Sequence, residues 1–152
     1  MQVILFEPEI PPNTGSIARL CAATRTRLHL IEPLGFSLDD RYLKRAGLDY
    51  WPSVDLDVWP DWQAFIQARP ELRLIFTSAR QGQPYHRFSF KPGDGLVFGP
   101  ETRGCPLEIL DQYPDQIVNI PIWGAVRSLN LSTAVGVVLY EALRQTGGLE
   151  TG

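Results

Sequence analysis

The stretch Phe98-Gly99-Pro100-Glu101-Thr102-Arg103-Gly104 is the part of this chain that says most about its fold. It follows the short apolar run Leu96–Phe98, and a second loop, Ser128-Leu129-Asn130-Leu131-Ser132, stands about two dozen residues further on. Each loop follows a strand-like run and leads into a helix-like segment. In an open α/β sheet, ligands bind outside the carboxyl ends of the strands, so the two loops together predict a ligand site.

The composition is that of an ordinary globular protein, with 44% apolar and 20% charged residues over 152 residues, a length that fits one domain. The net charge of −3 does not favour a polyanionic partner, but basic side chains concentrate in the first third and permit a local basic surface. The two cysteines, Cys21 and Cys105, favour a reduced protein. With neither a basic leader nor a long apolar run, we expect a cytoplasmic protein without a membrane span.

Short apolar runs alternate with helix-like segments along the chain. We expect strands at Gln2–Phe6, Leu28–Ile31, Val54–Val58, Leu72–Thr77, Leu96–Phe98 and Ile117–Ile120. We expect helices at Asn13–Thr24 (capped by Asn13 or Thr14), at about 37–46 (capped by Ser37 or Asp39), from Asp61 to before Pro70, at Pro106–Leu110 and at Asn130–Gln145. This alternation predicts an α/β fold, a mostly parallel sheet with helices on both faces.

The first loop offers backbone freedom and one carboxylate. Gly99 would let the backbone approach a ligand closely, and Gly104 can adopt the positive φ of a tight turn. Glu101 lies between them and could face the ligand site at the carboxyl end of the strand. Alternatively, it could pair with Arg103 or with helix amides. The spacing Gly-x-Glu-x-x-Gly matches neither the dinucleotide fingerprint nor the lysine-containing phosphate loop. It therefore favours a nucleoside-like ligand held by backbone groups over a cofactor bound through its phosphates.

The second loop precedes a helix that is apolar nearly all round. Ser128 and Asn130 suit helix capping. The helix carries apolar side chains on one face and extends them to the other, at Leu131, Ala134, Val135, Val137, Val138, Leu139, Tyr140 and Leu143. A helix without a clearly polar side is buried on two fronts, and a partner subunit is one candidate for the second.

Basic residues in the first third have two interpretations each. Arg19 lies on the opposite side of its helix from Ile17, and a solvent-exposed arginine is the simpler interpretation. Arg41, Lys44 and Arg45 form a basic stripe that could bind phosphates or could be a solvated helix face. The two histidines have no partners at metal-ligand spacing, so no metal site is expected.

Three segments in this order resemble the three motifs of the SPOUT superfamily of RNA methyltransferases. They are Asn13-x-Gly15-x-Ile17-x-Arg19, Gly99-x-Glu101-x-x-Gly104 and Ile120-Pro121-x-x-Gly124-x-x-x-Ser128-Leu129-Asn130-x-Ser132. The flanking stretches 7–15 and 45–50 are similar to one branch of that superfamily. Enzymes of this branch methylate the ribose 2′-hydroxyl of the tRNA wobble nucleotide, which is cytidine or a modified uridine at position 34.

The resemblance implies one domain over residues 1–152, with a deep trefoil knot and the cofactor site in roughly residues 72–146. It implies S-adenosylmethionine as cofactor without a metal, a tRNA substrate, and a homodimer with sites at the interface. Carried over by position, cofactor contacts fall at Thr77, Gly99, Glu101, Ile120, Ser128 and Leu129. Catalytic positions are Arg19, Asn130 and Tyr140, and RNA-binding positions are Arg41, Lys44 and Arg45.

The implied reaction is attack of a ribose 2′-hydroxyl on a methyl carbon. A guanidinium keeps its proton, so we favour Arg19 holding the adjacent phosphate and stabilising the alkoxide over Arg19 acting as a base. Asn130 would orient the hydroxyl or the cofactor. Three alternatives remain: action on another tRNA or rRNA 2′-hydroxyl, a binding-only relative of the same fold, and a flavodoxin-like or dinucleotide-binding protein, which the missing phosphate loop disfavours.

Overall fold

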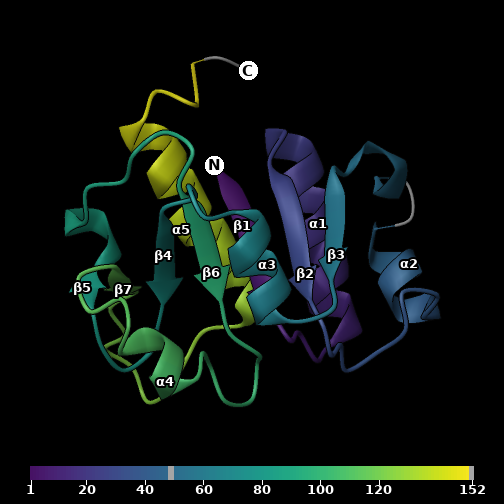
Figure 1. Ribbon diagram of the computed structural model, residues 1–152, viewed down its shortest axis with the longest axis horizontal. Coiled ribbons are helices and arrows are strands. Elements are labelled where there is room, and N and C mark those ends of the chain that lie inside the picture. The colour runs from purple at the N-terminus through teal and green to yellow at the C-terminus, as the bar shows by residue number, and fades with distance from the viewer. Residues whose placement is uncertain (48–49, 151–152) are drawn as a thin grey trace.

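The computed structural model describes residues 1–47 and 50–150, and within them seven parallel strands form one sheet with helices on both faces (Figure 1). The strands are β1 (Gln2–Phe6), β2 (Arg27–Ile31), β3 (Leu56–Trp59), β4 (Leu74–Thr77), β5 (Gln83–Pro84), β6 (Gly95–Phe98) and β7 (Ile117–Asn119). The helices are α1 (Pro11–Thr24), α2 (Arg41–Gly47), α3 (Trp62–Ala68), α4 (Leu107–Leu110) and α5 (Leu131–Gln145), with short 3-10 turns η1 (Trp51–Ser53) and η2 (Tyr85–Arg87).

The strand order is β3-β2-β1-β6-β4-β7-β5, which puts distant parts of the chain side by side. β1 pairs with β2 from Gln2 opposite Arg27 onward, and on its other edge with β6, where Gln2 lies opposite Gly95. Val3 and Leu5 are fully buried in this position. A strand that is paired on both edges and covered on both faces needs a continuous apolar run, which the sequence of β1 provides.

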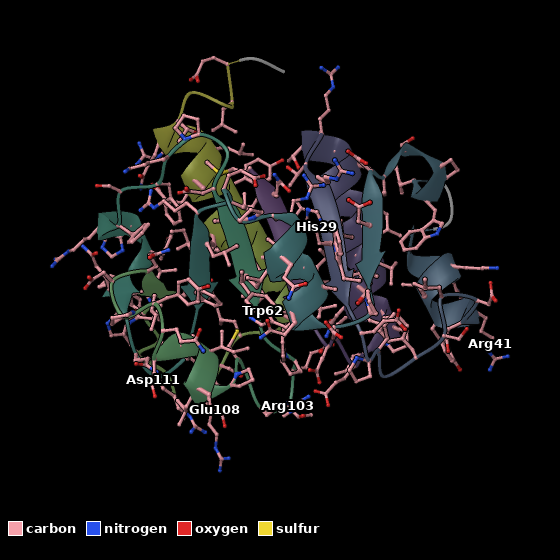
Figure 2. The ribbon with its side chains drawn as sticks, in the orientation of Figure 1. His29, Arg41, Trp62, Arg103, Glu108 and Asp111 are labelled. Atoms are coloured by element: carbon pink, nitrogen blue, oxygen red, sulfur yellow. The ribbon has the colours of Figure 1, made fainter. Side chains whose placement is uncertain are left out.

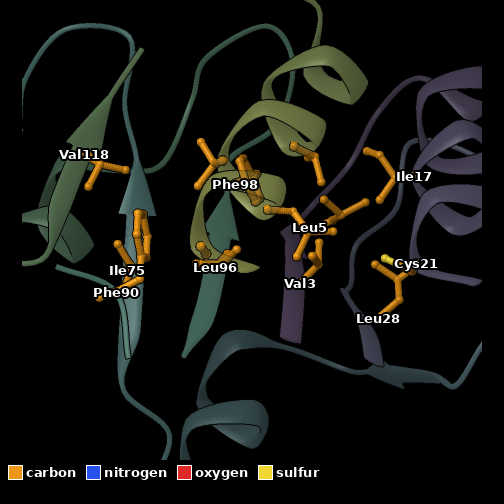
Figure 3. Close-up of a cluster of buried hydrophobic side chains, with 14 of the residues drawn as sticks. Val3, Leu5, Ile17, Cys21, Leu28, Ile75, Phe90, Leu96, Phe98 and Val118 are labelled. Atoms are coloured by element: carbon orange, nitrogen blue, oxygen red, sulfur yellow. The ribbon is translucent and has the colours of Figure 1, made fainter. Parts of the chain in front are cut away.

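Side chains that alternate along the strands fill two separate cores. On one face, Val3 and Leu5 pack with Ile17 of α1 and with Val135 of α5 (Figure 3 shows part of this cluster). On the other face, Ile4 and Phe6 belong to a second cluster that includes Phe65 of α3 and Leu110 of α4. Helices α1 and α5 therefore cover one face of the sheet, and α3 and α4 cover the other, as the sequence predicts.

The expected elements are all present, with ends that shift by at most four residues, the largest shift being at the start of α2. Asp61 caps α3 as predicted, because its side chain accepts a hydrogen bond from Ala64 N. The segment between the strands expected at Leu72–Thr77 and Leu96–Phe98 also holds β5 and η2, whose two and three residues are too short to give a periodic pattern.

Two predicted helix caps are wrong. Helix α1 begins at Pro11 with Ile10 as its N-cap, so Asn13 and Thr14 lie buried inside the first turn and do not cap it. The two prolines that open the helix have no N–H, which leaves fewer amides to cap. Helix α2 begins at Arg41, and Asp40 rather than Ser37 or Asp39 accepts from the first amides, those of Tyr42 and Leu43.

β4 and β6 both point downward in Figure 1, so their carboxyl ends lie at the same edge of the sheet, above α4. This edge is where a parallel sheet binds ligands.

In the described part of the chain, no helix has the length and apolar character needed to cross a membrane.

Candidate functional site

A pocket opens at the carboxyl ends of β4, β6 and β7, against the first turn of α5. It is lined by Thr77, Ser78, Ala79, Phe98, Gly99, Pro100, Glu101, Gly104, Ile120, Ile122, Ser128, Leu129, Leu131 and Ala134. The structure therefore brings together, around one hollow, all six residues at which the sequence predicted cofactor contacts.

The pocket lining combines apolar side chains with a hydroxyl that has no partner. Ile120, Leu129 and Ala134 supply apolar surface. Thr77 Oγ1 is buried and makes no hydrogen bond to any described residue. Buried hydroxyls in folded proteins nearly always have a partner, so Thr77 Oγ1 is free to donate to or accept from a bound ligand.

Gly99 is required by the loop itself. A Cβ atom at this position would lie 2.1 Å from Cys105 N and 2.2 Å from the carbonyl carbon of Gly104. Gly104 adopts a φ of +67°, a left-handed conformation that favours glycine. The loop after β6 thus folds back on its own backbone at Gly99. The close approach seen at Gly99 is to the chain's own loop. The approach of a ligand to Gly99 stays a prediction.

Glu101 connects the first loop to the N-terminus of α1. Its Oε1 accepts a hydrogen bond from Glu9 N at 2.8 Å, and its Oε2 accepts from Ile10 N at 2.8 Å and from Asn13 Nδ2 at 3.2 Å. Both carboxylate oxygens are therefore engaged within the chain. Neither interpretation from the sequence is the one in the structure: the two backbone amides precede α1, the Asn13 donor is a side chain, and Arg103 binds Glu7.

Hydrogen bonds from Thr102 to Glu9 reinforce this link between the loop after β6 and the segment before α1. Glu9 Oε1 accepts from Thr102 N at 2.9 Å and from Thr102 Oγ1 at 2.8 Å. These bonds lower the pKa of Glu9, and the bond from the Thr102 backbone amide has the largest effect. Arg103 lies at the lower edge of the molecule in Figure 2 and donates to Glu7 Oε1 at 2.8 Å. The segment before α1 and the loop after β6 consequently form one hydrogen-bonded unit.

Asn130 joins the third segment to the same unit. Its Oδ1 accepts from Ser132 N at 2.9 Å and Thr133 N at 3.3 Å and so caps α5, as the sequence predicts. Its Nδ2 donates to Asn13 Oδ1 at 3.0 Å, and Asn13 in turn donates to Glu101. Asn13 is the residue that the sequence interpretation missed. It stands in the first motif, but its spacing suggested only a helix cap.

Arg19 and Tyr140 do not line this pocket. Arg19 is exposed on α1, with its guanidinium 4.8 Å from the centre of the Tyr50 ring. Tyr140 is 46% exposed and lines a different hollow near Met1 and Arg25. It stands ten residues beyond Asn130 on α5, a rise of about 15 Å along a helix. A single chain therefore does not gather all three predicted catalytic residues.

The predicted basic stripe is on the surface of α2, which packs against α1. Arg41, Lys44 and Arg45 are exposed, and Figure 2 shows Arg41 at the end of the molecule remote from α4. Lys44 Nζ lies 3.6 Å from Asp39 Oδ1, a surface ion pair of little strength. Of the similar stretch at 45–50, residues 48 and 49 are outside the described residues.

His29 is structural. Trp59 Nε1, which can only donate, binds His29 Nδ1 at 3.0 Å, so the proton of the neutral ring is on Nε2 and faces Gln2 Oε1 at 2.6 Å. Burial lowers the pKa of His29 from 6.5 to about 4, and the ring stays neutral although Asp57 lies 3.7 Å away. No group of three or more potential metal ligands occurs among the described residues.

Comparison with known proteins gives consistent matches over almost the whole chain. Residues 1–140 match the SpoU rRNA Methylase family. The chain is 52% identical over 149 residues to the tRNA (cytidine(34)-2′-O)-methyltransferase of Burkholderia ambifaria, with 95% of each chain covered. It is also 52% identical over 149 residues to the protein of the same name from Escherichia coli K12, covering 97% of this chain and 94% of that one.

Solved structures agree with these matches. A structure concerned with 2-OH methylation of C/U34 on tRNA has a TM-score of 0.90 and 49% identity, covering 95% of this chain and 94% of that chain. The SpoU methyltransferase AviRb from Streptomyces viridochromogenes, in complex with AdoMet, has a TM-score of 0.83 and 26% identity. That match covers 95% of this chain and 60% of AviRb.

Proposed function

The chain belongs to the SpoU rRNA Methylase family, and from this membership we propose that it transfers a methyl group to the ribose 2′-hydroxyl of nucleotide 34 of tRNA. The acceptor is cytidine or a modified uridine. The observation that carries the proposal is the pocket shared by the ends of β4, β6 and β7, in a chain 52% identical to relatives with that activity.

S-adenosylmethionine is the proposed cofactor, and the residues of the pocket fit it. The buried, unpaired Thr77 Oγ1 suits a polar group of a nucleoside, and Ile120, Leu129 and Ala134 suit its apolar faces. Loop backbone at Gly99 and Ser128 offers further polar groups. When bound, this cofactor supplies a methyl group already activated by the positive sulfonium, so the chemistry calls for no metal.

Arg19 is the proposed contact to the substrate at the reacting atoms. Its guanidinium makes no hydrogen bond or ion pair within the described residues, so its N–H donors are free. It would bind the phosphate next to the 2′-hydroxyl and stabilise negative charge on that oxygen. The hydroxyl proton would then pass to the phosphate or to water.

We propose a positioning role for Asn130 beside the predicted one of orienting the substrate or the cofactor. Its Oδ1 caps α5 and one N–H of its Nδ2 binds Asn13, which leaves the second N–H of that amide for a ligand. We assign it to positioning: it holds the loop at Ser128 and Leu129 in place relative to α1. Glu101 acts in the same way on the loop after β6, since its oxygens bind Glu9, Ile10 and Asn13.

The proposal also includes a homodimer. Arg19 and Tyr140 lie outside the pocket of their own chain and are exposed on α1 and α5. A second copy that placed these helices over the pocket would complete the site, with Tyr140 supporting the reaction. The surface of Arg41, Lys44 and Arg45 would bind the tRNA backbone on a cytoplasmic enzyme.

One domain over residues 1–152, with a trefoil knot in roughly residues 72–146, belongs to the same proposal. Two features support it. The connection from β6 to β7 passes to the far side of β4. The segment after β4 lies against β7, where Asn119 Nδ2 donates to Gly82 O at 2.8 Å and a Cβ on Gly82 would lie 2.5 Å from Ile117 O.

The test is methyl transfer to tRNA in vitro. Purified protein is incubated with labelled S-adenosylmethionine and unmodified tRNA, and the product is digested and mapped by mass spectrometry. We expect a 2′-O-methyl group at nucleotide 34, and none on a control tRNA that carries a 2′-deoxynucleotide there. A methyl group at another position would point to the alternative substrate, whereas cofactor binding without transfer to any RNA would indicate a binding-only relative.

A further inference from the structure

The side chain of Arg19 is held by a single aromatic contact. Its guanidinium carbon lies 4.8 Å from the centre of the Tyr50 ring. Within residues 1–47 and 50–150, Arg19 has neither a hydrogen bond nor an ion pair. The arginine proposed to act on the substrate is therefore not fixed by a carboxylate, which is the usual partner of an ordered surface arginine.

The backbone of Tyr50 is fixed by the 3-10 turn η1. Tyr50 is the N-cap of η1, and its carbonyl oxygen accepts from Ser53 N at 2.8 Å. The next residue, Trp51, packs against the core cluster under α1. Tyr50 and Arg19 come from different elements, so the contact ties the segment after α2 to the exposed side of α1.

An aromatic contact restricts an arginine without using its hydrogen bonds. The five N–H donors of a guanidinium lie in its plane, whereas an aromatic ring attracts the cation through the ring face. A carboxylate in the same place would occupy two donors and neutralise the charge. Arg19 thus keeps its full charge and all its donors for a phosphate or a developing alkoxide while losing rotational freedom.

We propose that Tyr50 is a positioning residue that holds the Arg19 guanidinium for the methyl-transfer reaction, an inference that depends on the proposed function. Its phenol oxygen makes no hydrogen bond among the described residues, so the ring face alone carries the effect. Tyr50 is 38% exposed, and the ring can be altered without opening the core.

The experiment compares ring-retaining with ring-removing variants under steady-state conditions. Tyr50→Phe and Tyr50→Trp keep an aromatic face and should keep kcat within about twofold. Tyr50→Leu and Tyr50→Met keep apolar bulk without the face and should lower kcat about three- to tenfold, because an unrestrained guanidinium adopts the productive orientation less often. KM for tRNA should change by less than about twofold, since the cations of α2 are untouched.

Two further measurements separate positioning from a general structural effect. Affinity for S-adenosylhomocysteine and the thermal midpoint should be nearly equal in all four variants. In single-turnover assays with excess enzyme, adding Tyr50→Leu to Arg19→Gln should cost no further activity, because the cation that the ring contacts is already gone.

The assays distinguish a failure of the proposed function from a failure of the role assigned to Tyr50. A wild-type protein that methylates no tRNA overturns the proposed function and this inference with it. An active wild type whose Tyr50→Leu and Tyr50→Met variants turn over normally overturns the inference alone. So does a Tyr50→Phe variant as impaired as Tyr50→Leu, or a loss from Tyr50→Leu that adds fully to that of Arg19→Gln.

Discussion

Asn130 Nδ2 donates to Asn13 Oδ1 at 3.0 Å, across 117 positions of sequence, and this bond joins the cap of α5 to the first turn of α1. Asn13 also donates to Glu101, so one amide side chain connects all three motif segments. The pocket walls are consequently fixed relative to one another by side chains that do not themselves have to touch a ligand.

Replacing Asn130 by aspartate separates its two functions. The Asn130→Asp variant would still cap α5, because a carboxylate accepts from the amides of Ser132 and Thr133. The link to Asn13 would be broken, since a carboxylate would face Asn13 Oδ1, and rotating the Asn13 amide would only set that oxygen against Glu101. We expect Asn130→Asp to change the unfolding free energy by less than about 1 kcal/mol and to weaken cofactor binding at least about tenfold, measured by calorimetry. Asn130→Ala, which loses the cap as well, should be less stable than Asn130→Asp, and equal stability of the two would contradict this separation.

Gly99→Ala should disrupt the loop after β6. The new methyl group would overlap Cys105 N and the backbone of Gly104, which cannot move aside cheaply. Overpacking of this kind costs about 1–3 kcal/mol or more, so we expect a thermal midpoint lower by several degrees and loss of cofactor binding. Gly124→Ala in the other loop is the matched control, because its Cβ would meet nothing within 4 Å. Similar melting curves for the two variants would show that the close approach at Gly99 does not matter.

Arg19→Lys keeps the positive charge but loses the planar set of donors. If Arg19 binds the phosphate through two N–H groups, a point charge on a flexible stem cannot replace it. We expect kcat to fall at least about tenfold, with the affinity for S-adenosylhomocysteine unchanged because Arg19 does not line the pocket. Single-turnover methylation assays would measure this, and a near-normal rate would rule out the two-donor role.

Reversing the charges of Arg41, Lys44 and Arg45 to glutamate should weaken tRNA binding. Each phosphate that the variant no longer binds also reduces the salt dependence of binding, by nearly one unit of the logarithmic slope. We expect a tRNA affinity at least about tenfold lower at physiological salt, with a shallower salt dependence. Titration of the same variant with S-adenosylhomocysteine is the internal control. An unchanged tRNA affinity would mean that α2 is merely a solvated face.

The buried His29 should make the protein less stable in mild acid. Burial lowers the pKa of His29 from 6.5 to about 4. Between these two pH values the His29 ring is protonated in the unfolded chain and neutral in the folded chain. The stability linked to His29 is therefore complete above about pH 6.5 and is lost as the pH falls toward 4, by about 3–4 kcal/mol at most. Denaturant unfolding at pH 7 and pH 5 would measure it. His29→Gln should flatten this dependence, whereas His86→Gln, at an exposed position on η2, should not.

Much of the fold could be predicted because it depends on local signals. Apolar runs indicated the strands, Asp61 indicated a helix start, and Gly104 indicated a tight turn. The loops lining the pocket could also be located, because parallel strands bring their carboxyl ends to one edge.

The remainder depends on contacts between residues far apart in sequence. Asn13 resembled a cap because nothing near it shows that Glu101 and Asn130 would bind its side chain. The partner of Arg19 is Tyr50, which no helical spacing connects to it. The positions of Arg19 and Tyr140 outside the pocket also could not be foreseen, because exposure on α1 and α5 follows from how those helices pack on the sheet.

The place of β6 in the sheet has a consequence for synthesis of the chain. β1, β2 and β3 lie side by side and are complete once about sixty residues have left the ribosome, but the other neighbour of β1 is β6, at Gly95–Phe98. Until β6 has been made, the edge of β1 that faces away from β2 has unpaired amides and carbonyls along an apolar strand. Such an edge can pair with other chains. The nascent protein therefore exposes a strand edge that favours aggregation between the emergence of β3 and that of β6, and any pause of the ribosome in this interval would prolong it.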